Sequence, residues 1–274
     1  MVAEQQATFD AEKRLTIMGH FAELRSRLLR SVIAIGIGMG IAFAFAKPIF
    51  DVLTFKAVFL GPVFTFLHSN LHLFAPPDLH LVSIDITEMV GTYMKVCLIG
   101  GMVLAMPYLV YEVVMFVTPA LTRQQRKWFI HRALPWVGLM FFIGVAFAYF
   151  VLLPPAMRFL TTFGSDIATP QIRISNYVST VARLLLAVGL IFELPVLTTL
   201  LAWIGIVSSR WLAAKWKWAI IGAFLLGALI TPTLDPVNQT LVAVPLLGLY
   251  ALSVWMAKLV ELTRKRASAD NGQT

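Results

Sequence analysis

Charge is the scarcest property of this sequence. Only 13% of its 274 residues are Asp, Glu, Lys or Arg, whereas soluble domains carry about 25%. Hydrophobic residues make up 59% of the chain, and the mean hydropathy is +0.81. A soluble core of this length could not hide so much apolar surface. The composition therefore excludes a soluble domain and predicts an all-α, polytopic membrane protein.

The usual signatures of catalysis are missing as well. Cys97 is the single cysteine, so no intrachain disulfide can form, and there is no Cys/His cluster or HExxH pattern for a metal. The sequence also has no GxxxxGK[ST] loop to bind phosphates. Gly36 and Gly40 lie inside an apolar segment and are predicted to form a packing face between helices. We therefore expect neither an enzyme, nor a metal site, nor a cofactor.

Six apolar segments are separated by polar connections. They span residues 31–53, 89–117, 134–156, 177–205, 218–231 and 237–257. Because a helix needs about 20 residues to cross the hydrocarbon core, the first four are predicted to span it fully. The fifth is short and Pro245 interrupts the sixth, so the last two are predicted to form a short hairpin. Asp235 is the expected N-cap of the last helix.

Basic residues predict the orientation of these segments. Sixteen of the 22 Lys and Arg residues fall in 1–30, 119–133, 206–217 and 258–274, and four fall in the loops on the other side. Because cytoplasmic loops are enriched in Lys and Arg, both termini are predicted to be cytoplasmic. The chain then divides into a cytoplasmic region 1–30 with an amphipathic helix, a membrane domain 31–257 folded as a concave helical bundle, and a basic cytoplasmic tail 258–274. This orientation accounts for the net charge of +8, and no nucleic acid is expected as a partner.

Charged residues at the cytoplasmic ends of the helices form the first candidate site. In the stretch 18–31, Glu23, Arg27 and Arg30 share one helical face at i, i+4 and i+7. On residue types alone, the ordinary interpretation is an interfacial helix with an i,i+4 ion pair and arginines that contact anionic lipid. A second element, 115–129, is the end of an apolar helix followed by a short basic loop.

An acid inside the fourth apolar segment forms the second candidate site. Glu193 is the only acid of GLIFELPVLTTL, residues 189–200, and a carboxylate in hydrocarbon costs about 2.5–3.5 kcal/mol on insertion scales. Pro195 removes a helical hydrogen bond, so we expect a kink there, with Glu193 directed into a concave, partly hydrated face near mid-membrane. The alternative is an acid that is satisfied by a neighbouring helix.

Charges within apolar segments are also typical of a different class, the proton- or ion-coupled solute transporters. Glu193, Lys95 and Arg183 would fit such a protein, but the internal repeats that are usual in transporters are absent from this sequence. A structural scaffold for other membrane subunits is a third class that the composition allows.

Four motifs, in order, resemble one family, the TatC component of the twin-arginine protein translocase. They are HFAELRSRL at 20–28, FVTPAL at 116–121, FELP at 192–195 and TPTLDPVNQTLVAVPLLGLYALS at 231–253. Each motif alone is weak, but four at matching positions in a six-segment chain are specific. The resemblance covers roughly residues 15–260.

This resemblance implies a function that composition alone does not reveal. The family binds twin-arginine signal peptides of folded passenger proteins, and transport draws on the proton-motive force. It works with the single-span subunits TatA and TatB in an oligomeric complex of the cytoplasmic (inner) membrane bilayer. The corresponding signal-peptide site in this chain comprises Glu23 and Arg25 of the first motif and Phe116, Pro119 and Leu121 of the second. Glu23 suits this role because a guanidinium can bind a carboxylate bidentately.

Two positions depart from the family pattern. Gln125 stands where the family usually carries a glutamate, and this change weakens one expected arginine contact. Ala251 stands where many relatives have a second glutamate. Glu112, near the cytoplasmic end of the second helix, is the hypothetical replacement for the charge missing at Gln125. Its alternative role is that of an interfacial acid that reaches water. Asp235 likewise has an alternative role, as a contact to partner subunits at the outer hairpin.

Overall fold

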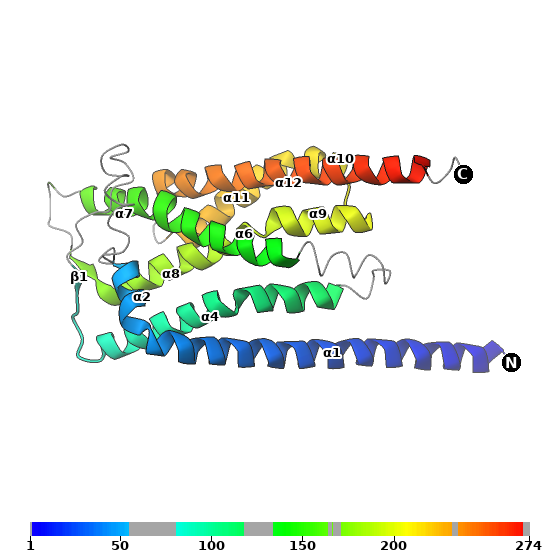
Figure 1. Ribbon diagram of the computed structural model, residues 1–274, viewed down its shortest axis with the longest axis horizontal. Coiled ribbons are helices and arrows are strands. Elements are labelled where there is room, and N and C mark those ends of the chain that lie inside the picture. The colour runs from blue at the N-terminus through cyan, green and yellow to red at the C-terminus, as the bar shows by residue number, and fades with distance from the viewer. Residues whose placement is uncertain are drawn as a thin grey trace.

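The protein is a bundle of long helices (Figure 1). The computed structural model describes residues 2–54, 81–117, 134–163, 166, 171–231 and 235–270. Along the chain these residues form α1 (Val2–Ala44), α2 (Ala46–Leu53), β1 (Leu81–Val82), α4 (Glu88–Val117), α6 (Leu134–Phe147), η5 (Ala148–Leu152), α7 (Leu153–Thr162), β2 (Ile172–Arg173), α8 (Ile174–Ile191), α9 (Leu194–Ile204), α10 (Ser209–Ala214), α11 (Trp216–Ile230) and α12 (Pro236–Asp270). Apart from the two-residue parallel pairing of β1 with β2, the predicted all-α architecture is confirmed.

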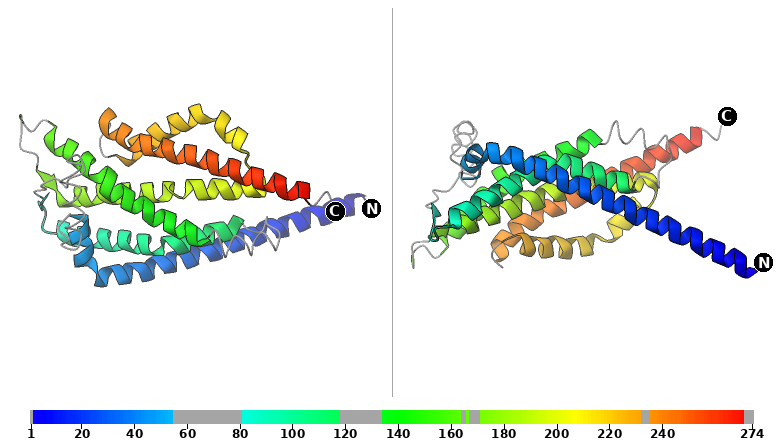
Figure 2. Two further views of the ribbon diagram at one scale, coloured as in Figure 1. Left: turned by 45° about the horizontal axis from the view of Figure 1, so that its top comes forward. Right: turned by 90° about the horizontal axis from the view of Figure 1, so that it is seen from below.

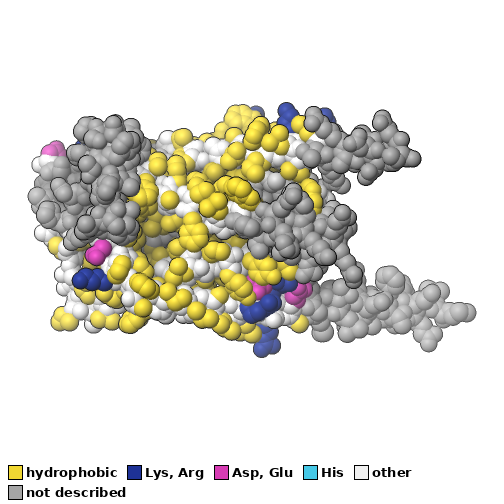
Figure 3. All heavy atoms as spheres, in the orientation of Figure 1, with side chains coloured by type: hydrophobic (Ala, Val, Ile, Leu, Met, Phe, Trp, Pro, Cys, Tyr) yellow, Lys and Arg dark blue, Asp and Glu magenta, His cyan; other side chains and the backbone are white. Residues whose placement is uncertain are grey.

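Five helical stretches of the described chain are long and apolar enough to cross a membrane. They are Phe21–Ala44, Glu88–Val113, Trp136–Thr162, Ile174–Ile204 and Pro236–Leu262. α11, with 15 residues, is a shorter apolar helix. Hydrophobic side chains cover the middle of the bundle's visible face, and charged side chains gather toward its two ends (Figure 3). These features confirm a multi-pass membrane protein whose fifth segment is short.

The sixth segment is longer than predicted. Its apolar part runs for 27 residues, from Pro236 to Leu262, and Pro245 lies inside a continuous α12. A proline removes only one N–H from the helix, and packing against neighbouring helices accommodates that loss within a membrane bundle. The prediction of two short helices is therefore correct for α11 and wrong for α12.

The predicted boundaries after residues 30 and 257 do not coincide with breaks in the backbone. α1 is continuous from Val2 to Ala44, and α12 continues to Asp270. The amphipathic stretch 18–31 is therefore one helix with the first membrane span. Both termini lie at the same end of the bundle (Figure 1), and the assignment of that end to the cytoplasm stays a prediction.

Two glycines let α1 and α4 cross in close contact. A Cβ atom on Gly38 would lie 2.6 Å from the carbonyl oxygen of Gly101, and one on Gly101 would lie 2.5 Å from the amide nitrogen of Met39. Cβ atoms on Gly36 and Gly40 would meet nothing within 4 Å, so the predicted packing face is the wrong one. Because successive residues turn by about 100° around a helix, Gly38 faces nearly away from Gly36 and Gly40.

The described helices pack side by side across the bundle. α1 packs mainly on α4, α4 packs on α6 and α8, α8 packs on α11, and α12 packs on α9 and α11. α1 and α12 therefore lie on opposite sides of the bundle, as two views agree (Figures 1 and 2). The concave shape that was expected of the bundle stays a prediction.

Two buried tyrosines fix the end of α2. The hydroxyl of Tyr149 on η5 donates to the carbonyl oxygen of Val52 at 2.5 Å, and that of Tyr177 on α8 donates to the carbonyl oxygen of Leu53 at 2.6 Å. The last carbonyls of a helix have no partner within the helix, so these hydroxyls satisfy two of them. The contacts also attach α2 to the main hydrophobic core.

Candidate functional site

A cluster of polar side chains joins α1 to α4 toward the end of the bundle that carries both termini. Glu23, Arg27 and Arg30 come from α1, and Tyr108 and Glu112 come from α4. We call these five residues the rim cluster. Spacings of three and four residues place the members from each helix on one face. The glycine contact between α1 and α4 lets the two faces meet.

Arg27 is the centre of the rim cluster. Its Nη2 and Nε atoms lie 2.5 and 3.2 Å from Oε1 of Glu23, and its Nη1 lies 2.9 Å from Oε2 of Glu112. The other oxygen of Glu112 accepts a hydrogen bond from the Tyr108 hydroxyl at 2.7 Å and lies 3.2 Å from Nη1 of Arg30. One guanidinium therefore bridges two carboxylates, and one carboxylate holds two guanidiniums.

Burial separates the rim cluster into two parts. Glu112 is 2% exposed, whereas the exposed fraction of the side chain is 14% for Arg27, 36% for Glu23 and 49% for Arg30. A buried carboxylate is costly unless it is paired and hydrogen-bonded, and Glu112 meets both conditions. Arg27 and Glu112 thus form a fixed inner part, and Glu23 and Arg30 form an accessible outer part.

Both acids expected to contact a signal peptide, Glu23 and Glu112, therefore lie in the rim cluster. Arg25 is exposed on α1 and faces nearly away from Glu23 and Arg27, because two residues turn a helix by about 200°. Phe116 is half-buried on α4, one turn after Glu112. The structure brings the two acids together across Arg27 and leaves Arg25 apart from them.

The other expected contacts, Pro119, Leu121 and Gln125, lie outside the described residues. Replacement of the charge missing at Gln125 by Glu112 accordingly stays a hypothesis. The sequence interpretation overlooked Tyr108, although its position four residues before Glu112 places both side chains on one face of a helix.

Glu193 lies at a break between two helices. α8 ends at Ile191 and α9 begins at Leu194, with Pro195 in the first turn of α9. The predicted interruption is therefore confirmed. A Cβ atom on Gly144 of α6 would lie 2.7 Å from Phe192, so α6 packs closely against the break.

The carboxyl group of Glu193 is enclosed. The residue is 1% exposed, and neither carboxyl oxygen has a hydrogen-bond partner among the residues that the structure describes. The expectation that Glu193 points into a concave, partly hydrated face is wrong, because α6 packs over the break. The alternative, an acid satisfied by a neighbouring helix, stays a prediction. Buried polar atoms without partners are rare in folded proteins and call for an explanation.

Asp235 caps α12. Its Oδ1 accepts a hydrogen bond from the backbone N–H of Asn238 at 2.7 Å, and its Oδ2 accepts one from the side-chain amide of Asn238 at 3.0 Å. Pro236 follows as the first residue of the helix. This arrangement confirms the predicted N-cap, while a contact between Asp235 and a partner subunit stays a prediction.

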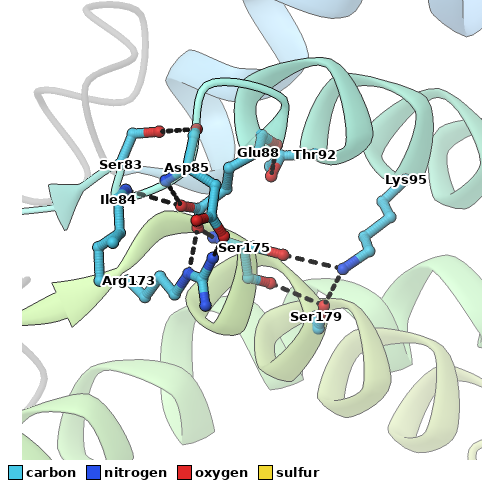
Figure 4. A network of polar contacts seen from close by, with 9 residues as sticks. All are labelled: Ser83, Ile84, Asp85, Glu88, Thr92, Lys95, Arg173, Ser175 and Ser179. Atoms are coloured by element: carbon cyan, nitrogen blue, oxygen red, sulfur yellow. Dashed lines mark hydrogen bonds and ion pairs between the residues drawn. The ribbon is translucent and has the colours of Figure 1, made fainter.

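A second network lies at the opposite end of the bundle and links the starts of α4 and α8 (Figure 4). Glu88 accepts hydrogen bonds from the backbone N–H groups of Ile84 at 2.8 Å and Ser175 at 3.1 Å. Arg173 pairs with Asp85 and lies 3.0 Å from Glu88. The hydrogen bond to Glu88 raises the pKa of Arg173, so the guanidinium stays charged. Within the described ranges, no group of three or more His, Cys, Asp or Glu side chains could hold a metal ion.

Known proteins resemble the chain over nearly its whole length. Residues 19–245 match the family model described as Sec-independent protein translocase protein (TatC). Relatives named Sec-independent protein translocase protein TatC from Carboxydothermus hydrogenoformans and Aquifex aeolicus are each 36% identical, covering 91% and 90% of this chain and 96% and 95% of their own. A crystal structure described as the twin arginine translocase receptor TatC superimposes with a TM-score of 0.72 at 36% identity, covering 88% of this chain and 99% of that one.

Proposed function

Because this chain belongs to the TatC family of Sec-independent protein translocase components, we propose that it is the receptor subunit for twin-arginine signal peptides. Members of this family are components of a translocase and are not enzymes. In our proposal the paired arginines of the peptide bind the rim cluster at the cytoplasmic side of the inner membrane. The relatives, which match over nearly the whole chain, do not favour a proton- or ion-coupled solute transporter.

One observation carries the proposal: the rim cluster already holds two guanidinium groups of its own. Arg27 and Arg30 are three residues apart and both contact Glu112, and Arg27 also makes two hydrogen bonds to Glu23. A planar guanidinium matches the geometry of a carboxylate, which a lysine ammonium does not. Two carboxylates that accommodate two internal arginines have the chemistry to accommodate two arginines of a peptide.

The peptide exchanges with Arg30 rather than with Arg27. Arg30 is half-exposed and reaches Glu112 through one contact of 3.2 Å, whereas Arg27 is held by three hydrogen bonds. One peptide arginine takes the place of Arg30 on Glu112, and the other approaches the exposed side of Glu23. The proposed site also includes Arg25, Phe116, Pro119, Leu121 and Gln125.

The partners belong to the same proposal. In an oligomeric Tat complex driven by the proton-motive force, TatA and TatB are the single-span subunits that associate with this chain. Asp235 contacts such a subunit at the start of α12, and Glu193 contacts a polar group of the peptide or of a partner helix within the membrane. Full transport by Asp235→Asn together with failure of Asp235→Ala would leave Asp235 with its N-cap role alone.

Peptide binding to the full-length protein in lipid nanodiscs tests the receptor proposal. The twin-arginine peptide should bind, and its twin-lysine variant should bind roughly tenfold more weakly because an ammonium makes no bidentate pair. Glu23→Gln should weaken binding of the twin-arginine peptide, since it removes the accessible carboxylate. Asp166→Asn, which neutralises an exposed acid beyond α7, is the matched control. Equal binding of both peptides, or normal binding by Glu23→Gln, would contradict the proposal.

A further inference from the structure

Two basic side chains within membrane-spanning stretches have no acidic partner among the described residues. Lys95 belongs to the apolar stretch Glu88–Val113 and Arg183 to the stretch Ile174–Ile204. Both are exposed, and in the part of the chain that the structure describes neither forms an ion pair with a carboxylate. A charge that faces hydrocarbon is costly, so such residues usually have a polar partner.

The two side chains are held near each other by a shared serine. Lys95 reaches from α4 to α8, where its Nζ donates to Oγ of Ser175 at 2.9 Å and to Oγ of Ser179 at 3.2 Å (Figure 4). Nε of Arg183 donates to the carbonyl oxygen of Ser179 at 3.3 Å. The two positive charges, from two different helices, therefore converge on one turn of α8.

Both side chains extend toward the end of the bundle at which α4 and α8 begin. Lys95 lies seven residues into α4, about 10 Å along its axis, yet its amino group reaches Ser175 in the first turn of α8. Arg183 reaches back by one turn toward that same end. Long basic side chains in membrane helices extend in this way toward the headgroup layer.

Among the described residues, no acid compensates this positive charge. The nearest acids of the polar network at that end, Asp85 and Glu88, already pair with Arg173. The neighbouring side chains of α4 that are open to the surroundings are apolar, with Met94 and Leu98 each 42% exposed. Because no described acid pairs with these two cations, their apolar, exposed surface at headgroup depth suits an anion from outside the chain.

We propose that Lys95 and Arg183 bind the phosphate of an anionic phospholipid in the leaflet opposite the rim cluster. The guanidinium of Arg183 supplies planar donors to phosphate oxygens, and the ammonium of Lys95 supplies a point charge beside them. The hydroxyls of Ser175 and Ser179 hold the ammonium in place between the helices. The acyl chains of the lipid lie against the apolar side chains of α4. This site is independent of signal-peptide binding.

Lipid binding to the purified full-length protein tests this proposal. In detergent micelles titrated with phosphatidylglycerol or phosphatidylcholine, native mass spectrometry should show preferential retention of phosphatidylglycerol. The double variant Lys95→Gln/Arg183→Gln should bind phosphatidylglycerol about thirtyfold more weakly, as expected for the loss of two basic groups at a membrane surface. Lys95→Arg, which keeps the charge, should retain most of the binding.

The matched control removes two other exposed charges from the same end of the bundle, with Lys47→Gln and Arg158→Gln. Circular dichroism and size-exclusion chromatography identify any variant that has lost its fold. An equal loss of lipid in the control, or no preference for phosphatidylglycerol in the unaltered protein, would overturn the proposal. Unchanged lipid binding by the double variant, with loss of a co-purified single-span subunit, would assign the two cations to an acidic side chain of a partner helix instead.

Discussion

Arg27 and Glu112 are 85 positions apart in the sequence, yet Nη1 of the arginine lies 2.9 Å from Oε2 of the glutamate. The pair bridges α1 and α4, and α4 is the helix on which α1 mainly packs. The contact therefore helps to attach α1 to the bundle. It also neutralises part of the negative charge that Glu112 could offer to a peptide.

The first prediction concerns Arg30. Arg30→Gln removes the exposed guanidinium from Glu112 while Arg27 keeps its three hydrogen bonds. If the peptide must displace Arg30, this variant should bind a twin-arginine peptide more tightly, by up to about fivefold for an exposed ion pair. Fluorescence anisotropy with a labelled peptide measures the change, with Lys258→Gln, which removes an exposed cation of α12 outside the proposed site, as the control. Unchanged or weaker peptide binding by Arg30→Gln would contradict the proposal that a peptide arginine displaces Arg30 from Glu112.

The second prediction concerns stability. Arg27→Gln leaves the buried carboxylate of Glu112 with only an exposed arginine and Tyr108. Removing one partner of a buried pair costs about 3–5 kcal/mol, so the melting temperature in detergent should fall clearly. Arg25→Gln, on the exposed side of the same helix, should change it little. A melting temperature of Arg27→Gln that equals that of the unaltered protein would show that α1 is held by apolar packing alone.

The third prediction concerns the crossing of α1 and α4. A Cβ atom on Gly38 would lie 2.6 Å from a backbone oxygen, so Gly38→Ala should push the helices apart and cost about 1–3 kcal/mol. Peptide binding should weaken with it, because the two halves of the rim cluster separate. The Cβ atoms added by Gly36→Ala and Gly40→Ala would meet nothing within 4 Å. These two substitutions should therefore leave the protein's stability unchanged or raise it. If Gly36→Ala and Gly40→Ala lowered the stability and Gly38→Ala did not, the observed crossing of α1 and α4 would be contradicted.

The fourth prediction concerns Glu193. Its carboxyl oxygens are buried and have no partner among the described residues, and we expect them to bind a polar group once transport opens the surrounding helices. Glu193→Gln keeps the polar group and should retain most transport in vesicles, whereas Glu193→Ala should lose it. Binding of the peptide at the rim cluster should survive in both variants. Wild-type transport by Glu193→Ala would leave the carboxyl without a role in translocation.

Much of the fold could be predicted because membrane helices leave strong local signals. The length of an apolar segment, the N-cap at Asp235 and the interruption before Pro195 each depend on a few neighbouring residues. The choice of Gly38 over Gly36 and Gly40 could not be predicted, because it depends on which face of α1 meets α4. Spacing within one helix likewise gave the pairing of Glu23 with Arg27, whereas the pairing of Glu112 with Arg27 and Arg30 requires the crossing of two helices.

The tyrosine contacts at α2 fix the point at which the chain leaves the bundle. Tyr149 and Tyr177 hold the carbonyls of Val52 and Leu53, and the pairing of β1 with β2 holds the chain again at Leu81. The connection between these points is thus tied to the bundle at both of its ends. Because contacts within the bundle hold both of these ends, the positions of α2 and β1 do not depend on the chain that joins them.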